Sequence, residues 1–199
     1  MSRPPEHQPE TILAAALAVF CDRGVQASTA NVASVAGVSN GTLFNYFPTK
    51  QILIDRLYLW IKADLAEAIG EVDEALPTQQ QMRDVWDRWL EWARHHRDAH
   101  AVMNLLYQSH LVSDTARAEG LDQIRVPIRV LAGAYRAGVL VDLPLSYFAS
   151  LVQQQLDLAV AANLKDQEAA TAFGVLWTGI TDAPPEPNST TPSTPEDQE

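Results

Sequence analysis

The spacing of apolar side chains is the feature that most limits what this chain can fold into, because it is helical along almost the whole sequence. Apolar residues recur three and four positions apart, and no stretch shows the sustained alternation of a half-buried strand. Glycine and proline interrupt this pattern and mark the ends of helices. The sequence therefore predicts an all-α protein with about nine helices. We expect these helices at 10–23, 29–36, 40–47, 50–75, 78–94, 99–111, 121–137, 145–163 and 166–180.

The overall composition fits a folded globular protein and excludes several other classes. Apolar residues make up 47% of the chain and charged residues 20%, which is too apolar for global disorder. No apolar run approaches the ~18 residues that a membrane-spanning helix needs, and no signal-peptide pattern opens the chain. The single cysteine, Cys21, cannot form an internal disulfide, which favours a reducing compartment. We therefore expect a cytoplasmic protein with no membrane contact.

The two ends of the chain differ in composition from the helical middle. Residues 1–9 are polar and proline-rich, so we expect a flexible arm. Residues 183–199 contain five prolines, four acidic residues and no large apolar side chain. Such a segment cannot bury enough surface to offset its ordering entropy, and we expect a disordered tail.

Charge is distributed unevenly along the chain. The formal net charge is −11, but residues 1–50 carry three basic and three acidic side chains, so the excess of acid lies entirely in residues 51–199. A chain with a neutral N-terminal part and an acidic remainder can accommodate DNA only at its N-terminal end. The front nevertheless lacks the basic patch typical of a DNA-binding surface, and no Lys or Arg occurs between Arg23 and Lys50. If this end binds DNA, we expect few phosphate contacts and a shallow dependence of affinity on salt.

Residues 29–46 have the sequence of two short helices joined by a tight turn, the helix-turn-helix arrangement. Ala33 is small where the first helix must approach the second, and Gly37 permits the left-handed backbone of the turn. Either Ser39 or Asn40 can cap the second helix. Short polar side chains follow on its outer face, where they would let it enter a major groove about 12 Å wide. The motif indicates DNA binding, and an ordinary helical hairpin with a glycine turn is the alternative.

The wider segment around this motif resembles the DNA-binding domain of TetR/AcrR-family transcriptional regulators. The matching residues are Phe20, Gly24, Thr29, Ala33, Ala36-Gly37-Val38-Ser39, Gly41-Thr42-Leu43-Phe44, Tyr46-Phe47 and Lys50, and they match without a gap. The resemblance implies a DNA-binding domain at 10–52 and a ligand-binding and dimerisation domain at 53–182. The implied protein is a dimeric regulator, with repression as the expected output, that binds a palindromic operator and is released by a small effector.

By the same resemblance, the ends of the two motif helices and the outer face of the second would contact DNA. Thr29 and Tyr46 would contact backbone phosphates through their hydroxyls, and Lys50 would neutralise a phosphate. Asn45 is the best candidate for an amide contact with adenine. Phe44 replaces the family's usual Tyr, which exchanges a hydrogen bond for an apolar contact such as one with a thymine methyl. The expected DNA-binding residues are Thr29, Asn31, Ser39, Asn40, Gly41, Thr42, Phe44, Asn45, Tyr46 and Lys50.

The last two expected helices carry apolar stripes, and the resemblance implies that these helices form a dimer interface. A monomer would have to expose the stripes or bury them internally, whereas pairing across a two-fold axis would cover them. Two recognition helices would then lie about one DNA turn, ~34 Å, apart. The residues expected at the interface are Phe148, Val152, Leu156, Ala159, Phe173, Leu176, Trp177 and Ile180.

The middle helices are rich in aromatic and sulfur-containing residues, which the resemblance places in the ligand-binding domain. The residues expected to border an apolar effector pocket are Trp89, Met103, Tyr107 and His110. Plain core packing is the alternative for any one of them. A pocket with few polar groups suits a hydrophobic or aromatic effector. Its binding would shift the dimer towards a state whose recognition helices are wrongly spaced for the operator.

Other chemical motifs are weak or absent. His96 and His100 lie four residues apart, but no cysteine or compact set of carboxylates joins them, so we expect a solvated helix end and no metal site. The sequence has no glycine-rich phosphate loop and no catalytic signature, so we expect neither an enzyme nor a cofactor. Cys21 is expected to be a small buried side chain. The remaining alternative is a helical dimer that binds DNA weakly and acts through a protein partner.

Overall fold

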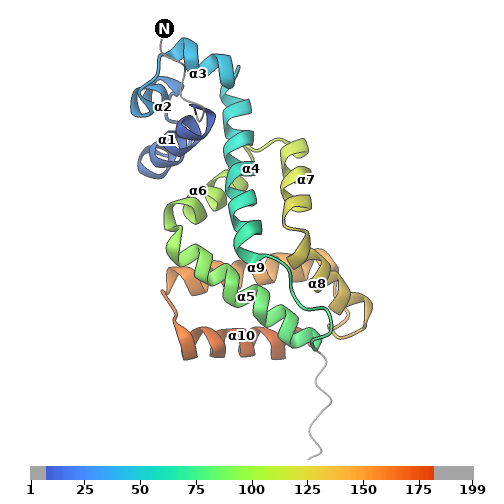
Figure 1. Ribbon diagram of the computed structural model, residues 1–199. Helices are drawn as coiled ribbons and strands as arrows, with labels where there is room; N and C mark the ends of the chain where they lie inside the picture. Colours follow the sequence, from blue (N-terminus) through green and yellow to red (C-terminus); the bar gives the residue numbers. More distant parts are fainter. Residues whose placement is uncertain (1–7, 182–199) are drawn as a thin grey trace, which may run out of the picture.

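The computed structural model describes residues 8–181, and within this range the chain forms ten α-helices (Figure 1). The helices are α1 (Gln8–Arg23), α2 (Thr29–Ala36), α3 (Asn40–Tyr46), α4 (Lys50–Ile69), α5 (Thr78–His95), α6 (Arg97–Gln108), α7 (Asp114–Gln123), α8 (Arg125–Arg136), α9 (Leu145–Ala161) and α10 (Asp166–Ile180). Extended pairing in the same range is limited to one isolated antiparallel bridge between Leu140 and Thr181. None of these helices has the length and apolar character needed to cross a bilayer. The predicted all-α class is confirmed.

Several helix boundaries differ from the expected ones, most of all the end of α4. α1 begins at Gln8, inside the segment expected to be an arm, and the rest of that arm and the whole expected tail lie outside the described residues. α4 ends at Ile69 rather than at residue 75. Gly70 ends it, because this residue adopts a positive φ of 58° and its N–H donates to the Ala66 carbonyl.

The structure has one helix more than expected, because the segment that follows α6 is helical. α7 starts where the Ser113 hydroxyl accepts a hydrogen bond from the Ala116 amide at 3.2 Å. The prediction of a single helix over 121–137 is wrong, since α7 ends at Gln123 and α8 begins at Arg125. Pro127 explains the break: within a continuous helix its ring would clash with the carbonyl four residues earlier, whereas it fits the first turn of a new helix.

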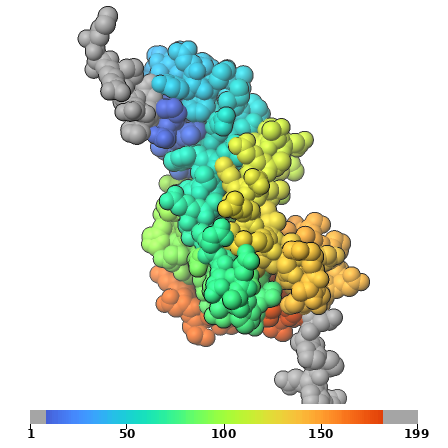
Figure 2. Space-filling model, turned by 45° about the vertical axis from the view of Figure 1, so that its right-hand side comes forward, coloured from blue at the N-terminus to red at the C-terminus, as the bar shows by residue number. Residues whose placement is uncertain are grey.

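α1, α2 and α3 form a small lobe at one end of the molecule, seen at the top of Figure 1. α1 packs against α2, and also against α4 and α6, which join the lobe to the rest. The core of the lobe consists of buried apolar side chains: Ile12, Ala16, Phe20, Val32, Leu43 and Phe47. Figure 2 shows the lobe in blue above the remaining helices. The position of α3 therefore depends on the two helices on which the lobe rests.

α4 runs from this lobe into a larger helical body, and with 20 residues it is about 30 Å long. α7 packs along it, as the yellow helix beside the turquoise one in Figure 2 shows. Gly120 allows this close approach, because a Cβ atom there would lie 2.6 Å from Cε1 of Tyr58. α5, α8, α9 and α10 complete the body around the far end of α4.

Candidate nucleic-acid interface and ligand cavity

Local hydrogen bonds fix the hairpin of α2 and α3. The Ser28 hydroxyl caps α2 by accepting from the Asn31 amide at 3.3 Å, and the Ser39 hydroxyl caps α3 by accepting from the Thr42 amide at 3.0 Å. Between the helices, Gly37 has the left-handed conformation, with φ 69° and ψ 26°. The Ser39 cap and the Gly37 turn agree with the sequence analysis, and together with the Ser28 cap they fix where the two helices begin and where the chain turns between them.

The outer face of α3 is exposed and carries no charge. Asn40, Gly41, Phe44 and Asn45 are all exposed, and their spacing places them on one side of the helix. The opposite side holds Leu43, which is fully buried in the lobe. The helix therefore presents a narrow face of amide, backbone and aromatic groups to the outside.

The other expected DNA-binding residues lie around this face. Ser39 and Tyr46 are exposed, whereas Thr42 and Lys50 are half-buried. Thr29 and Asn31 are half-buried in the first turn of α2. The hydroxyls of Ser39 and Thr42 lie 3.0 Å apart and hydrogen-bond to each other. Two of the expected DNA-binding hydroxyls thus already have a partner within the chain, and the contacts of the whole set with DNA stay predictions.

A cavity of about 350 Å³ lies inside the larger helical body. Its wall is formed by side chains from α4 to α10, and it includes Trp89, Met103 and Tyr107 from the predicted pocket. His110 is not in the wall: it is exposed, follows the end of α6 and has a positive φ of 55°. The expectation for His110 needs correction, because the sequence predicted a helix to residue 111 and α6 ends before it.

The cavity wall holds a buried ammonium group that the sequence analysis did not predict. Lys62 of α4 is only 7% exposed. Its Nζ lies 5.6 Å from the centroid of the Tyr58 ring and 5.8 Å from that of Trp89. Burial lowers the pKa of Lys62 to about 8. The sequence did contain a signal, since Lys62 lies four residues after Tyr58 and three before Leu65 on the buried face of its helix.

An acidic group in the same wall is held through one of its oxygens by three neighbouring side chains. Oδ1 of Asp157 lies 3.1 Å from Nε2 of His100, and it accepts hydrogen bonds from the side-chain amides of Asn104 at 2.8 Å and Gln153 at 3.1 Å. Burial alone would raise the pKa of Asp157, but the hydrogen bonds from His100, Asn104 and Gln153 outweigh it and hold this pKa below its usual value. His100 is therefore a buried partner of Asp157, not part of a solvated helix end as predicted.

The apolar stripes predicted for the dimer interface face the chain's own core. Six of the eight residues are buried within the single chain: Phe148, Leu156, Ala159, Phe173, Leu176 and Ile180. Val152 and Trp177 are half-buried against the same core. The ring centroids of Phe173 and Trp86, for example, lie 5.9 Å apart. The assignment of these six needs correction, because a side chain covered by its own chain has no surface to offer a partner.

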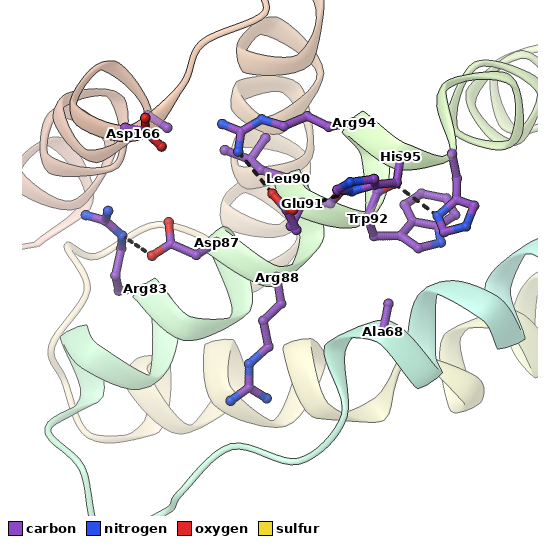
Figure 3. Close-up of a pocket in the computed structure, with 12 residues that line it drawn as sticks. Ala68, Arg83, Asp87, Arg88, Leu90, Glu91, Trp92, Arg94, His95 and Asp166 are labelled. Carbon is purple, nitrogen blue, oxygen red and sulfur yellow. Dashed lines mark hydrogen bonds and ion pairs between the residues drawn. The ribbon is translucent and has the colours of Figure 1, made fainter.

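A second hollow, of about 620 Å³, lies along the outer face of α5 (Figure 3). Its charged groups pair within the chain: Nε of Arg83 lies 2.7 Å from Asp87, and Nη1 of Arg94 lies 3.4 Å from Glu91. Arg88 points away from these pairs and donates to the carbonyl of Ile69, the last residue of α4, at 2.6 Å. The hollow is therefore a surface groove in which most of the charged side chains are already paired.

Two further expectations concern cysteine and metal ligands. Cys21 is exposed at the end of α1, so the prediction of a buried side chain is wrong. Among residues 8–181, no group of three or more His, Cys, Asp or Glu side chains is arranged to hold a metal ion.

Comparisons with known proteins agree with this geometry. Residues 12–57 match the family model described as bacterial regulatory proteins, tetR family. The chain is 24% identical over 143 residues to the HTH-type transcriptional regulator LuxR of Vibrio harveyi, a match that covers 60% of this chain and 70% of the relative.

Solved structures extend the similarity over most of the chain. A tetR family transcription regulator from Shewanella sp. PV-4 has a TM-score of 0.79 and 26% identity, covering 87% of this chain and 98% of that one. A TetR family regulator from Marinobacter aquaeolei VT8 shares the fold at 14% identity, with a TM-score of 0.74 and coverage of 89% and 97%. Residues 12–57 therefore form a DNA-binding domain of the tetR type, and the chain as a whole shares the fold of TetR-family transcriptional regulators.

Proposed function

We propose that the protein is a dimeric repressor that binds a palindromic operator and is released by a small-molecule effector. The observation that carries the DNA-binding part is the outer face of α3, exposed at the end of the molecule and held by a capped hairpin. An exposed, uncharged helix with short side chains can reach base edges in the major groove. The proposal requires neither catalysis nor a cofactor, and its DNA target places the protein in the cytoplasm.

The dimer is proposed to form through the outward faces of α9 and α10. Tyr147, Leu158 and Val175 are large apolar side chains on these helices, and they are 52%, 62% and 67% exposed in the single chain. They lie on faces other than the buried stripes of the same helices. Pairing the two helices with their copies across a two-fold axis would cover these side chains.

Two physical connections support coupling between the cavity and α3. α4 carries Lys50 in its first turn, beside the lobe, and Tyr58 and Lys62 in the cavity wall. The loop after α6 is tied to the start of α4, because Nε2 of Gln51 donates to the Leu111 carbonyl at 2.7 Å. A ligand that moves α4 or α6 would therefore also move the lobe, and with it the spacing of two recognition helices.

The DNA-binding part is tested by replacing the amide predicted to meet adenine. We expect Asn45→Ala to weaken operator binding by about tenfold, since a good contact to a base edge is worth ~1–3 kcal/mol. The matched control is Gln80→Ala, which removes an exposed amide from α5, far from the lobe. Footprinting on the promoter of the protein's own or an adjacent gene supplies the operator. Unchanged affinity in a folded Asn45→Ala variant would contradict the proposed role of α3.

A second candidate function is a helical dimer that binds DNA weakly and acts through a protein partner. The observation that favours it is the absence of Lys and Arg from α2 and α3. The same footprinting experiment separates the two functions, because this candidate predicts no protected promoter site.

A further inference from the structure

The cavity wall contains a positive charge that the described chain does not neutralise. Within residues 8–181, no hydrogen bond or ion pair engages the ammonium of Lys62, which lies over the Tyr58 and Trp89 rings. The negative charge of Asp157 acts on it only through space and offsets part of the effect of burial on its pKa. Burying a charge without a partner costs several kcal/mol in proteins. A charge kept in such a place is expected to meet its partner from outside the chain.

Two hydrogen-bond donors in the same wall have no acceptor in the described structure. The indole N–H groups of Trp86 and Trp89 are buried without a partner in the described structure. The nearest acidic group, Asp157, already receives His100, Asn104 and Gln153, and no ion pair joins it to Lys62. An occupant that accepts hydrogen bonds and carries negative charge would correct both deficits.

The rest of the cavity sets the size and character of this occupant. A volume of about 350 Å³ lies at the small end of ligand sites, which span ~300–1,000 Å³. Met82, Met103, Ile128, Leu131 and Phe173 give the wall large apolar surfaces. The body of the occupant is therefore compact and apolar, and only one end of it is charged.

We propose that the cavity binds a small monocarboxylate with an apolar or aromatic body, whose carboxylate pairs with the Lys62 ammonium. The inference rests on the proposed ligand-responsive function. The sequence predicts a hydrophobic or aromatic effector in a pocket with few polar groups, whereas the effector inferred from the structure is an anion with an apolar body. Burial lowers the pKa of Lys62 only to about 8, so the protonated form still predominates at pH 7. The charge needed for the pairing is thus present at neutral pH.

Three probes of the same size test the proposal: phenylpropionate, phenylpropanol and phenylpropylamine, each titrated into the full-length protein by calorimetry at pH 7. Trp86 and Trp89 in the wall give tryptophan fluorescence as a second readout. We expect the carboxylate to bind about tenfold or more tightly than the alcohol, because a hydrogen bond to a charged group is worth ~1.5–3 kcal/mol. The amine should bind most weakly.

Variants then identify the group that selects the acid. Lys62→Met should reduce the preference for the carboxylate over the alcohol to about twofold or less while the alcohol still binds. Lys165→Met is the matched control, since it removes an exposed lysine at the start of α10 and should leave the preference unchanged. The ranking of the probes on the wild-type protein tests the proposal even if a variant fails to fold.

Two results on the wild-type protein would overturn the proposal: equal or reversed affinities of the three probes, or no binding of the carboxylate at millimolar concentration. A Lys62→Met variant that still prefers the carboxylate to the alcohol as strongly as the wild type would also overturn it. These titrations contain no DNA, so their outcome is independent of operator binding. If the carboxylate binds through Lys62 but leaves the operator complex intact, the site stands and the proposed ligand-responsive function fails.

Discussion

The face of α3 and the wall of the cavity hold their polar groups under opposite conditions. Asn40 and Asn45 are exposed, so water can satisfy their amides in the free protein. Lys62 is almost fully buried and has no acceptor in the described chain. An exposed polar group costs a folded protein almost nothing, whereas a buried group without a partner lowers its stability. Substitutions of exposed polar groups on α3 should therefore change DNA binding with little effect on stability. Substitutions of buried polar groups in the cavity wall should change both ligand binding and stability.

The largest expected effect comes from the inner face of α3, which contrasts with the outer face of the same helix. Leu43→Ala should lower the free energy of unfolding by about 2–5 kcal/mol, because it removes a fully buried side chain from a small core. Phe44→Ala, on the exposed side, should change it by less than about 0.5 kcal/mol. Urea denaturation measures both values. Equal losses for the two variants would show that α3 does not have distinct buried and exposed faces.

The next effect concerns the cavity, where we expect a substitution to increase stability. Lys62→Met should raise the free energy of unfolding of the ligand-free protein by about 1–3 kcal/mol, because it removes a buried charge and keeps the apolar stem. A loss of stability would mean that the ammonium has a stabilising partner in the free protein.

Stability against pH checks the same charge. The pKa of Lys62 is about 8 in the folded chain and ~10.4 in an unfolded one, so the unfolded state binds more protons between these values. Wild-type stability should therefore rise from about pH 8 to pH 10, and Lys62→Met should lack this rise. The window stops at about pH 10 because burial raises the pKa of Tyr58 to about 12, and stability from this group is lost as the pH rises above the unfolded tyrosine value of ~10.

Salt dependence tests how few charges the DNA-facing surface uses. With Lys50 as the only basic residue of the candidate interface, we expect a slope of log affinity against log salt of about −2 to −4 per dimer. Quantitative operator binding between 50 and 200 mM salt, roughly the range over which such slopes are measured, gives this value. A slope near −8 or steeper would show that many more phosphates are neutralised than α2, α3 and the start of α4 can account for.

The smallest expected effect joins the two regions. Gln51→Ala removes the side chain that links the first turn of α4 to the Leu111 carbonyl. It should reduce effector-induced release of the operator about threefold, less than 1 kcal/mol of coupling, with little change in operator affinity without effector. Gln80→Ala serves as the exposed control. If the variant releases the operator as readily as the wild type, the Gln51 hydrogen bond does not contribute to the coupling, and α4 alone connects the cavity to the lobe.

Local signals explain why the hairpin could be predicted from the sequence. Ser28, Ser39 and Thr49 each cap the helix that follows, and Gly37 forms the turn, because a cap or turn depends on a few adjacent residues. Ser113 is an equally local cap, but only Ala116 and Gly120 of α7 are buried. Without a strong apolar stripe, the sequence does not predict this helix.

Tertiary choices explain why the rest could not be predicted. α9 and α10 carry apolar residues on more than one face, and the sequence does not say which face the chain's own core will cover. Phe148 and Phe173 were therefore assigned to a partner although they pack internally. Lys62 was missed for a related reason: it follows Ile61 on an apolar stripe, and only the packing of other helices around it shows that its charged end is enclosed.

The exposed thiol of Cys21 has a practical consequence for studying motion in this protein. It is the single cysteine of the chain and lies near the end of α1, in the lobe that carries α3. A maleimide dye or nitroxide can thus be attached at one place without engineering. Mildly alkaline pH favours the reaction, because partial desolvation and the neighbouring Asp98 carboxylate raise the pKa of this thiol. In a homodimer the two labels would form a spectroscopic ruler across the two lobes, and its length with and without effector would report directly whether they separate.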